Sequence, residues 1–336
     1  LRPTENDSTR GASGYVLSKL VNNMENMVVA SADLSGSDKT AGFLKGTTPF
    51  VKGDFSGAFL NAGVSELSMA AVMNGMALHG GIMPVCGTFF VFSDYMKPAV
   101  RLAALMELPV IYIWSHDSFR VGEDGPTHQP IEQEAQIRLL EQVQNHSGQN
   151  SLLALRPADG AETVTAWQMA LENRKTPTAL IFTRQKIKDL PPASDQTRAQ
   201  EAQKSRKGAY ILYEPQQKPD LVLVGNGSEV YMLYEVAREL DQQKNIHARL
   251  VSAISEGLFR NQPMEYQKRV VPDDIPVFGV TAGLPAALKG LVGRNGEVYG
   301  MDHFGYSAPA SVLDEQFGYT SQNILSKIVA FMERQG

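Results

Sequence analysis

Side chains that can transfer protons or bind anions are concentrated in residues 116–130, which read His-Asp-Ser-Phe-Arg-Val-Gly-Glu-Asp-Gly-Pro-Thr-His-Gln-Pro. This stretch holds two histidines and three carboxylates, and its glycines and prolines bend it into a loop. Histidine donates, accepts or carries a proton near neutral pH. We therefore interpret the segment as a functional loop; the alternative is a solvated loop whose histidines only hydrogen-bond the backbone. A hydrolytic triad on Ser118 is disfavoured, because no Gly-x-Ser-x-Gly motif surrounds it.

Two other groups of residues have both a structural and a functional interpretation. Glu66 stands at the start of an apolar helical pattern, where a carboxylate is either a charge favoured by the helix dipole or a buried functional acid. Phe89, Phe92 and Tyr95 are spaced by three, which places them near one face of a helical turn. Viewed in isolation, both groups favour the structural interpretation: a helix-terminal charge and a core stripe.

The elements around these residues alternate between helix and strand. Apolar residues at helical spacing predict helices over 11–25, 65–79 and 95–106. Apolar runs predict strands at 27–30, 83–89, 109–114, 152–155 and 178–182. Such alternation predicts a parallel sheet covered on both faces, and ligands bind beyond the carboxyl ends of such strands. The loop at residues 116–130 follows one of them directly.

A polar stretch from about Lys186 to Lys207 interrupts this pattern, which then restarts with strands near 220–224, 248–251 and 276–280. We predict an α/β protein of two domains, each a mostly parallel sheet flanked by helices. The predicted bounds are 1–190 and 208–336, with a linker at 191–207. Gly225-Asn-Gly-Ser lacks the third glycine of a dinucleotide fingerprint, so we expect a tight strand-to-helix turn with Ser228 as N-cap.

Composition excludes several classes of protein. The 336 residues carry a net charge of −5, which argues against a nucleic-acid partner. A single cysteine, Cys86, excludes a disulfide framework and a cysteine-based zinc cluster. No apolar run reaches the roughly 18 residues of a membrane span, and the first residues are too polar for a signal peptide. We expect a cytoplasmic globular protein with no membrane partner and no metal ligands of its own.

Taken together and in order, these segments resemble transketolase over essentially the whole chain. The motifs that carry the resemblance are Ser31-Ala-Asp-Leu34, Gly63-Val-Ser-Glu66, Asn74-Gly-Met-Ala-Leu-His-Gly80, Gly87-Thr-Phe89, the loop 116–130, Leu155-Arg-Pro-Ala-Asp159, Pro177-Thr-Ala-Leu-Ile-Phe-Thr-Arg184 and His303-Phe-Gly-Tyr-Ser-Ala-Pro-Ala310. The resemblance implies a first domain that binds the pyrimidine ring of thiamine diphosphate and a Rossmann-like C-terminal domain.

The family's remaining domain, which binds the cofactor diphosphate, has no counterpart here. That domain carries a Gly-Asp-Gly motif, whereas Lys52-Gly-Asp54 runs into Phe55. Since the chain also begins at Leu1, we expect the diphosphate-binding half to be a separate subunit or a piece lost from this chain. The resemblance assigns the ligands of Mg²⁺ or Ca²⁺ to that half.

The resemblance also assigns roles to individual residues. Glu66 would hydrogen-bond the pyrimidine nitrogen, and His128 would lie near the reacting carbon, so these two are the expected catalytic residues. The other expected cofactor contacts are Asp33, Leu34, Phe89, Phe92 and Tyr95. Sugar phosphates would be bound by Arg10, Ser37, His116, Asp124, His128 and Arg184. Arg120 departs from the family pattern, and we expect it near the phosphate channel.

The implied reaction is the transfer of a two-carbon ketol unit from a ketose phosphate, such as xylulose 5-phosphate, to an aldose phosphate, such as ribose 5-phosphate. It would belong to the pentose phosphate pathway and to a homodimer. One alternative is the β-type subunit of a 2-oxo acid dehydrogenase or a 1-deoxyxylulose-5-phosphate synthase-like enzyme. The phosphate set Arg10, Ser37 and Arg184 argues against a dehydrogenase. A non-catalytic paralogue is a further alternative, which the presence of Glu66 disfavours.

Overall fold

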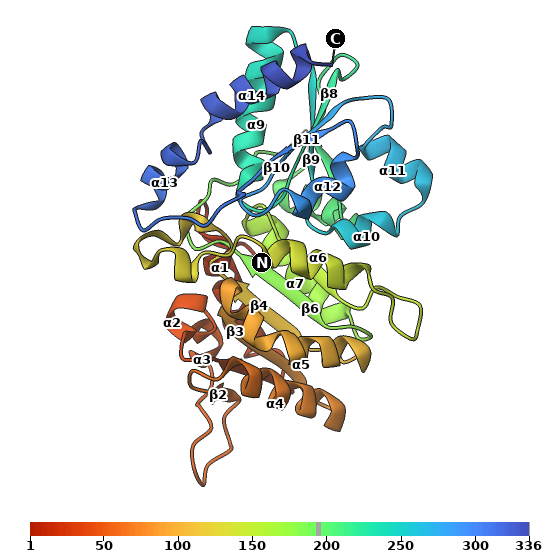
Figure 1. The fold of residues 1–336 in the computed structure, drawn as a ribbon. Helices are drawn as coiled ribbons and strands as arrows, with labels where there is room; N and C mark the ends of the chain where they lie inside the picture. The colour runs from red at the N-terminus through yellow and green to blue at the C-terminus, as the bar shows by residue number, and fades with distance from the viewer. Residues whose placement is uncertain (193–195, 336) are drawn as a thin grey trace.

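The computed structural model describes residues 1–192 and 196–335, which form two α/β units stacked along the molecule (Figure 1). The first unit contains a six-stranded sheet of order β2-β1-β3-β4-β6-β5, and every pairing in it is parallel. Its strands are β1 (Met27–Ser31), β2 (Phe59–Asn61), β3 (Met83–Phe89), β4 (Ile111–Ser115), β5 (Leu153–Leu155) and β6 (Thr178–Phe182).

Helices cover both faces of this sheet, because its central strands are apolar on both sides. Val28 and Ala30 face a core shared with α4 and α5, whereas Met27 and Val29 face a core shared with α1 and α7. The helices of this unit are α1 (Thr9–Leu20), α2 (Ser35–Asp38), α3 (Ala41–Leu44), α4 (Glu66–His79), α5 (Ser93–Leu105), α6 (Gln133–Gln142) and α7 (Gly160–Glu172), with 3₁₀ turns η1 (Phe90–Phe92), η2 (Phe119–Asp124) and η3 (Pro126–His128).

The second unit contains a five-stranded sheet of order β11-β10-β8-β9-β7, in which only the pairing of β7 with β9 is antiparallel. Its strands are β7 (Tyr210–Tyr213), β8 (Leu221–Gly225), β9 (Ala248–Ser252), β10 (Val277–Val280) and β11 (Glu297–Tyr299). Its helices are α9 (Glu229–Glu239), α10 (Glu256–Arg260), α11 (Met264–Val270), α12 (Ala286–Val292), α13 (Ala310–Gln316) and α14 (Ser321–Glu333), with the π-turn η5 (Leu240–Lys244).

The two sheets confirm the predicted fold class, and most predicted elements lie within two residues of the observed ones. The first helix differs more at its end, because α1 spans Thr9–Leu20 and the prediction extended it to residue 25. It begins at Thr9, where the Ser8 side chain accepts a hydrogen bond from the Gly11 amide and caps it. The strands β2, β7 and β11 have three or four residues each and were not predicted. Short strands carry too few residues to show a hydrophobic period.

Part of the predicted linker is helical in the structure. The helix α8 (Arg198–Ala202) begins with a reciprocal capping box between Thr197 and Gln200, and η4 (Gln203–Lys207) follows it. Residues 193–195 of the linker and residue 336 lie outside the described residues.

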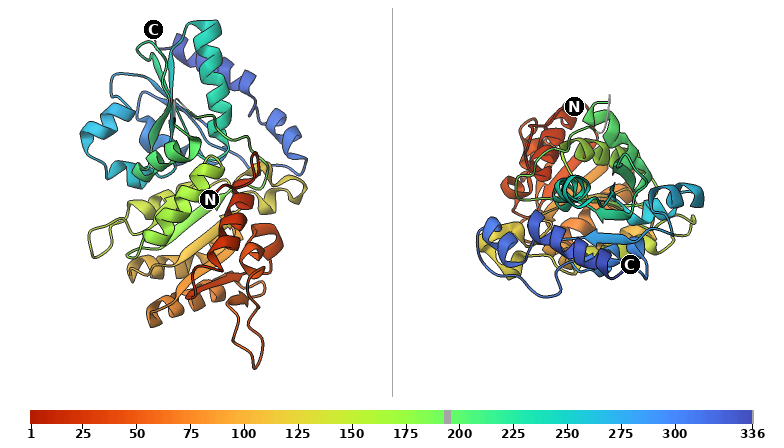
Figure 2. Two further views of the ribbon diagram at one scale, coloured as in Figure 1. Left: turned by 180° about the vertical axis from the view of Figure 1, so that it is seen from behind. Right: turned by 90° about the horizontal axis from the view of Figure 1, so that it is seen from above.

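The chain ends lie at different levels of the molecule. The N-terminus lies near the junction of the two units, whereas the C-terminus lies at the far end of the second unit (Figures 1 and 2). At the opposite end, the segment between α3 and β2 projects away from the body of the first unit. Within residues 1–192 and 196–335, no helix has the length and apolar character needed to cross a membrane.

Candidate active site

The predicted site residues lie mainly on segments that leave the carboxyl ends of parallel strands of the first sheet. The segment after β1 carries Asp33, Leu34 and Ser37, the segment after β3 carries Phe92 and Tyr95, and the segment after β4 carries the loop of residues 116–128. Because these strands are parallel neighbours, their carboxyl ends meet at one edge of the sheet. Arg184, just after β6, lies at the same edge, and Arg10 reaches it from α1.

Arg10 and His116 are in direct contact there. Arg10 Nη1 donates a hydrogen bond of 2.6 Å to the Ser37 carbonyl oxygen and lies 3.4 Å from His116 Nε2. Since a guanidinium is only a donor, Nε2 is the acceptor and the proton lies on Nδ1, which is 2.9 Å from Ser115 Oγ. Burial, with a further contribution from the nearby charges of Arg10 and Arg184, lowers the pKa of His116 to about 2. His116 is therefore a neutral ring with a defined tautomer.

Neither arginine of this edge forms an ion pair with a carboxylate of the described residues, although Asp7 and Asp38 lie close enough for their charges to act on Arg10. Burial lowers the pKa of Arg10, and the nearby charge of Arg184 adds to the effect. Arg10 Nε is buried without a hydrogen-bond partner, and Arg184 makes no ion pair or side-chain hydrogen bond with any residue that the structure describes. Two like charges at a buried edge favour the binding of an anion, and a guanidinium fork suits phosphate oxygens.

His116 is held in an unfavourable backbone conformation. Its φ of 63° lies in the left-handed region, which few residues other than glycine adopt. Its ring stacks on Phe89 with a centroid distance of 3.6 Å. The surrounding contacts therefore determine where this ring points, which is typical of residues at functional sites.

The aromatic residues 89, 92 and 95 form a continuous stack. Phe89 and Phe92 have ring centroids 5.9 Å apart, and Phe92 and Tyr95 are 6.0 Å apart, both in stacked geometry. The 3₁₀ turn η1 explains this, because three residues per turn place side chains at i and i+3 in line. Phe89 is buried, but Tyr95 is 62% exposed, so the interpretation as a core stripe is wrong. Phe90 is the core residue of this turn and stacks on Trp114.

Glu66 is the first residue of α4 and is only 8% exposed. Glu66 is thus both an acid at the start of a helix and a largely buried one, so the two interpretations of this residue do not exclude each other. Its carboxylate has no side-chain hydrogen bond or ion pair within the described part of the chain. A nearly buried acid without a partner is poised to accept or donate a hydrogen bond to a bound group.

The segment after β1 is organised by Asp38, which the sequence analysis did not single out. The Asp38 carboxylate accepts hydrogen bonds from Ser31 Oγ (2.7 Å), from the Thr40 amide (2.8 Å) and from Thr40 Oγ1 (2.7 Å). Burial raises the pKa of Asp38 to about 6 against these hydrogen bonds. The carboxylate holds the turn on which Asp33, with a φ of 62°, and Leu34 stand.

His128 joins the aromatic stack, whereas Asp124 stays at the rim. The His128 ring meets Phe92 edge-on at 5.4 Å and Phe89 at 6.2 Å. Asp124 is exposed, and no side-chain hydrogen bond or ion pair connects it to another predicted site residue in the described chain. The structure therefore brings together Arg10, Ser37, His116, His128 and the aromatic stack, and leaves Asp124 outside these contacts.

Arg120 does not line a phosphate channel, so that expectation is wrong. Its side chain turns toward the second unit, where Nη1 lies 2.7 Å from Glu229 and Nε lies 2.6 Å from Asp314. Phe119 points the same way and packs against Phe317 and Tyr319. The sequence departure at these two positions therefore serves the contact between the units.

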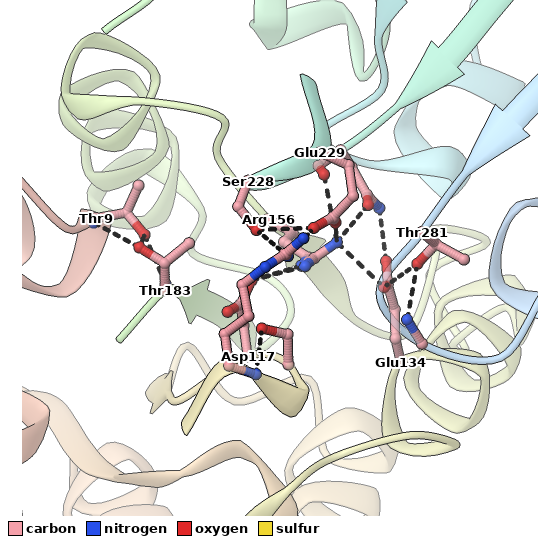
Figure 3. Close-up of polar contacts among 12 residues, drawn as sticks. Thr9, Asp117, Glu134, Arg156, Thr183, Ser228, Glu229 and Thr281 are labelled. Atoms are coloured by element: carbon pink, nitrogen blue, oxygen red, sulfur yellow. Dashed lines mark hydrogen bonds and ion pairs between the residues drawn. The ribbon is translucent and has the colours of Figure 1, made fainter. Parts of the chain in front are cut away.

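Around Arg120 lies a buried group of charged and polar residues between the units, which we call the interdomain cluster (Figure 3). Its central arginine, Arg156, follows β5 and contacts Asp117, Glu229 and Asn226. The complete cluster consists of Asp117, Arg120, Glu134, Arg138, Glu141, Arg156, Asn226, Ser228, Glu229 and Asp314. A charged residue directly after an apolar strand, as at Arg156, was the available sequence signal.

The turn at Gly225-Asn-Gly-Ser is part of this cluster. The strand β8 ends at Gly225 and α9 begins at Glu229, as predicted. Ser228 stands at the N-cap but makes no capping bond; its hydroxyl donates instead to Glu229 (2.8 Å). In contrast, Asp159 does cap the helix α7, since its carboxylate accepts a hydrogen bond from the Glu162 amide at 2.8 Å.

No group of three or more histidine, cysteine, aspartate or glutamate side chains in the described residues is arranged to hold a metal ion. Cys86 is a buried free thiol whose pKa is raised by burial.

Comparisons with known proteins agree with this geometry. The family model "Transketolase, pyrimidine binding domain" matches residues 6–189, and "Transketolase-like TK C-terminal domain" matches residues 208–320. A transketolase of Halalkalibacterium halodurans is 42% identical over 98% of this chain. The chain covers 47% of that relative, so it spans about half the length of the transketolases that it matches.

Solved structures extend the likeness to three dimensions. A Pichia stipitis transketolase in complex with sedoheptulose 7-phosphate is 33% identical and superposes with a TM-score of 0.87, over 99% of this chain and 47% of that one. A protein described as a split gene transketolase, inactive beta4 tetramer, has a TM-score of 0.73 at 22% identity and is covered over 98% of both chains. The latter likeness concerns the fold alone. The matches along both units show that this chain belongs to the transketolase family, of which it carries the pyrimidine-binding and C-terminal portions.

Proposed function

We propose that this chain is one part of a working transketolase and supplies half of its active site. It would act with a diphosphate-binding half in the transfer of a two-carbon ketol unit from a ketose phosphate to an aldose phosphate. The observation that carries this proposal is the pairing of Arg10 and Arg184, neither of which forms an ion pair with a carboxylate of the described residues, at the sheet edge that also bears His116. A site for a sugar alone would not need two adjacent cations.

The proposal includes a division of the chain at the linker. Residues 1–190 would form the pyrimidine-binding domain and residues 208–336 the C-terminal domain, joined by residues 191–207. Two separate sheets and the two family matches support this division. Of the linker, residues 191–192 and 196–207 are described.

The residues present fit the pyrimidine end of thiamine diphosphate. Phe92 and Tyr95 offer stacked aromatic faces that are open to a ring, and Glu66 offers a nearly buried carboxylate without a partner. Thiamine diphosphate, when bound, supplies the nucleophilic carbon that attacks the ketose carbonyl. Glu66 would share a proton with a ring nitrogen, and Phe89, Asp33 and Leu34 would border the same ring. The ligands of Mg²⁺ or Ca²⁺ would belong to the diphosphate-binding half.

The substrate phosphate would be bound between Arg10 and Arg184. Ser37 and His116 complete this group: the Ser37 carbonyl and the neutral His116 ring both accept from Arg10 and so orient its fork. His128, beside the aromatic stack, would transfer a proton at the reacting carbon, and Asp124 would hydrogen-bond a sugar hydroxyl at the rim.

A partner surface would lie on α4, the helix that Glu66 begins, and on α5. The outward faces of α4 and α5 expose apolar side chains, which monomeric surfaces seldom gather in one place. These side chains are Leu67, Val72, Leu78, Leu102, Leu105 and Met106. We propose that the diphosphate-binding half covers this face in a homodimeric assembly. The activity would belong to the pentose phosphate pathway in the cytoplasm.

The test is a ketol-transfer assay with xylulose 5-phosphate, ribose 5-phosphate, thiamine diphosphate and Mg²⁺. The purified chain is assayed alone and with a diphosphate-binding half from a relative. Activity only with the added half is the expected result. Activity of the chain alone would contradict the need for a second half, and transfer from a 2-oxo acid but not from a ketose phosphate would favour the dehydrogenase alternative.

A further inference from the structure

One carboxylate of the second unit, Glu229, contacts two arginines that belong to the first unit (Figure 3). We infer that Glu229 is a positioning residue for the anion-binding group of Arg10, His116 and Arg184. The inference rests on the proposed function and deepens it, because it gives the C-terminal domain a role in binding the substrate phosphate.

The first connection runs through Arg156. Glu229 Oε2 lies 2.7 Å from Arg156 Nη1, and the other side of the same guanidinium holds the Asp117 carboxylate, with Nε at 2.9 Å and Nη2 at 2.7 Å. Asp117 directly follows His116 in the chain. The guanidinium thus connects Glu229 to the covalent neighbour of His116 through one rigid plane.

The second connection runs through Arg120. Glu229 Oε1 accepts from Arg120 Nη1 at 2.7 Å and from Ser228 Oγ at 2.8 Å, while Arg120 Nε donates to Asp314 at 2.6 Å. Arg120 stands four residues after His116, on the same short loop. The one carboxylate therefore holds the loop at two points on the carboxyl side of His116.

His116 needs such external support because its backbone is in the left-handed region. If the loop relaxed toward an ordinary conformation, the ring would leave Phe89, which it now stacks at 3.6 Å, and Arg10, which it now meets at 3.4 Å. Arg10 would then lose one of the two acceptors that orient its fork. The interdomain contact would in this way determine the geometry of the anion-binding group.

The contact is closely fitted rather than incidental. Gly227 has a φ of 56°, and a Cβ at this position would lie 2.7 Å from Arg156 Cζ, so only a glycine leaves room for the arginine. The side chains of Glu229, Arg156 and Asp117 are almost completely buried. Burial raises the pKa of Glu229, but Arg156 and Arg120 outweigh it and lower the pKa overall, so the carboxylate stays charged.

The experiment measures binding of inorganic phosphate to the full chain by calorimetry, which requires neither cofactor nor turnover. Glu229→Gln keeps the side-chain shape and removes the charge. We expect it to weaken phosphate binding by about tenfold, since a small displacement of positioning groups has effects of this order or larger. The matched control is Glu235→Gln, on the same helix but exposed and, among the described residues, paired with Lys188 and Ser321 and not with the interdomain cluster. It should bind phosphate as the wild type does.

A second variant, Asp314→Asn, keeps the inference testable if Glu229→Gln does not fold. Asp314 is less buried and touches only Arg120 of the cluster, so we expect a smaller weakening, about threefold, in a folded protein. In the reconstituted enzyme, Glu229→Gln and Asp314→Asn should each raise the KM of phosphorylated donors. Neither should change the kinetics with an unphosphorylated ketose. A merely structural role would change both donors alike.

The outcomes separate this inference from the proposed function. Unchanged phosphate affinity in folded Glu229→Gln or Asp314→Asn would overturn the inference. A wild-type chain without saturable phosphate binding would overturn it together with the anion site. If phosphate binding depends on Glu229 as expected but the reconstituted enzyme transfers no ketol unit, the inference stands and the proposed reaction fails.

Discussion

Two pairs of arginines lie near the carboxyl ends of strands of the first sheet, and their surroundings differ. At the contact between the units, Arg120 and Arg156 each meet carboxylates at 2.6–2.7 Å. At the edge of the first sheet, Arg10 meets a carbonyl and a neutral histidine, and Arg184 has no such partner among the described residues. Carboxylates of the chain form ion pairs with the first pair, whereas the second pair has no ion-paired carboxylate among the described residues, which is the arrangement that our proposal of an anion site requires.

The same contrast holds for the acids. Glu229 is shared by two arginines and a serine, whereas Glu66 is nearly buried with no partner of its own in the described chain. The Glu66 carboxylate oxygens are not among the fully buried atoms without a partner, so they keep access to solvent and are open to a bound group. The comparison therefore separates groups that stabilise the fold from groups that await a bound molecule, and it can be tested from both sides.

The largest expected effect is at Glu66. Glu66→Gln should lower kcat of the reconstituted enzyme by about 10³-fold, since loss of a general acid–base group costs 10²–10⁴-fold. The thermal midpoint of the variant should not fall, because no contact within the described chain is lost. Glu265→Gln, at an exposed position on α11, is the control. A Glu66→Gln enzyme with normal turnover would remove Glu66 from the machinery.

In contrast to Glu66→Gln, Arg156→Met should lower the stability of the fold. Removal of this arginine leaves Asp117 and Glu229 buried without their main cation, and breaking a buried ion pair costs roughly 3–5 kcal/mol of unfolding free energy. Denaturant unfolding at neutral pH measures the loss. A stability loss under 1 kcal/mol would show that the interdomain cluster does not hold the units together.

Asp38 should make stability depend on pH. Its pKa is raised from 3.8 to about 6 on folding, so the folded chain binds a proton more tightly than the unfolded chain between these values. Stability from this group is therefore present at low pH and is lost as pH rises through 6. Asp38→Asn should remove that loss and be more stable than the wild type by about 2 kcal/mol at pH 7 relative to pH 4.

The measurement is chemical unfolding of both proteins across this pH range. Asn retains an acceptor for Thr40 and gains a donor toward Ser31, so the hydrogen bonds survive the change. Asp302→Asn, at an exposed position, should show no such difference. Parallel pH profiles for the wild type and Asp38→Asn would contradict the prediction.

Arg10→Met should affect the substrate and not the fold. Loss of a hydrogen bond to a charged group costs about 1.5–3 kcal/mol, so the KM of phosphorylated donors should rise roughly 20-fold. Unlike Arg156→Met, this change should leave the unfolding free energy within 1 kcal/mol of the wild type, because it removes like-charge repulsion with Arg184. Arg174→Met, on the surface, is the control. If Arg10→Met and Arg156→Met lose equal amounts of unfolding free energy, the distinction between the anion-binding edge and the interdomain cluster is contradicted.

Much of the fold was predictable because its strands are apolar on both faces. Runs such as those at β3 and β4 indicate buried parallel strands without any structural information. The antiparallel strand β7 was missed, since its four residues follow helical turns in a polar stretch. The type of most elements could be predicted from the local sequence pattern, whereas the pairing of β7 with β9 depends on tertiary contacts between segments that are distant in the sequence.

The candidate site also has features that the local sequence predicts and features that depend on tertiary contacts. The loop with His116 and His128 stands out by its residue types, and the structure brings both histidines onto the aromatic stack. Arg120 was assigned to the wrong surroundings, because a sequence position gives no direction to a long side chain. The role of Glu229 could not be predicted, because its partners Arg156 and Arg120 are 73 and 109 residues away in the sequence. The role of Asp38 could not be predicted either, because its partners include the backbone amide of a local turn at Thr40.

The charged face between the two units also bears on how the chain is made. Every strand of the first sheet lies before residue 183, so this unit can fold while the rest is still being synthesised. Until the second unit arrives, the surface that awaits it includes Asp117, Arg120, Glu134 and Arg156, which water solvates readily. A half-made chain therefore exposes charged, hydrated groups on this face beside the apolar side chain of Phe119, and the charged groups are desolvated only when Glu229 packs against them.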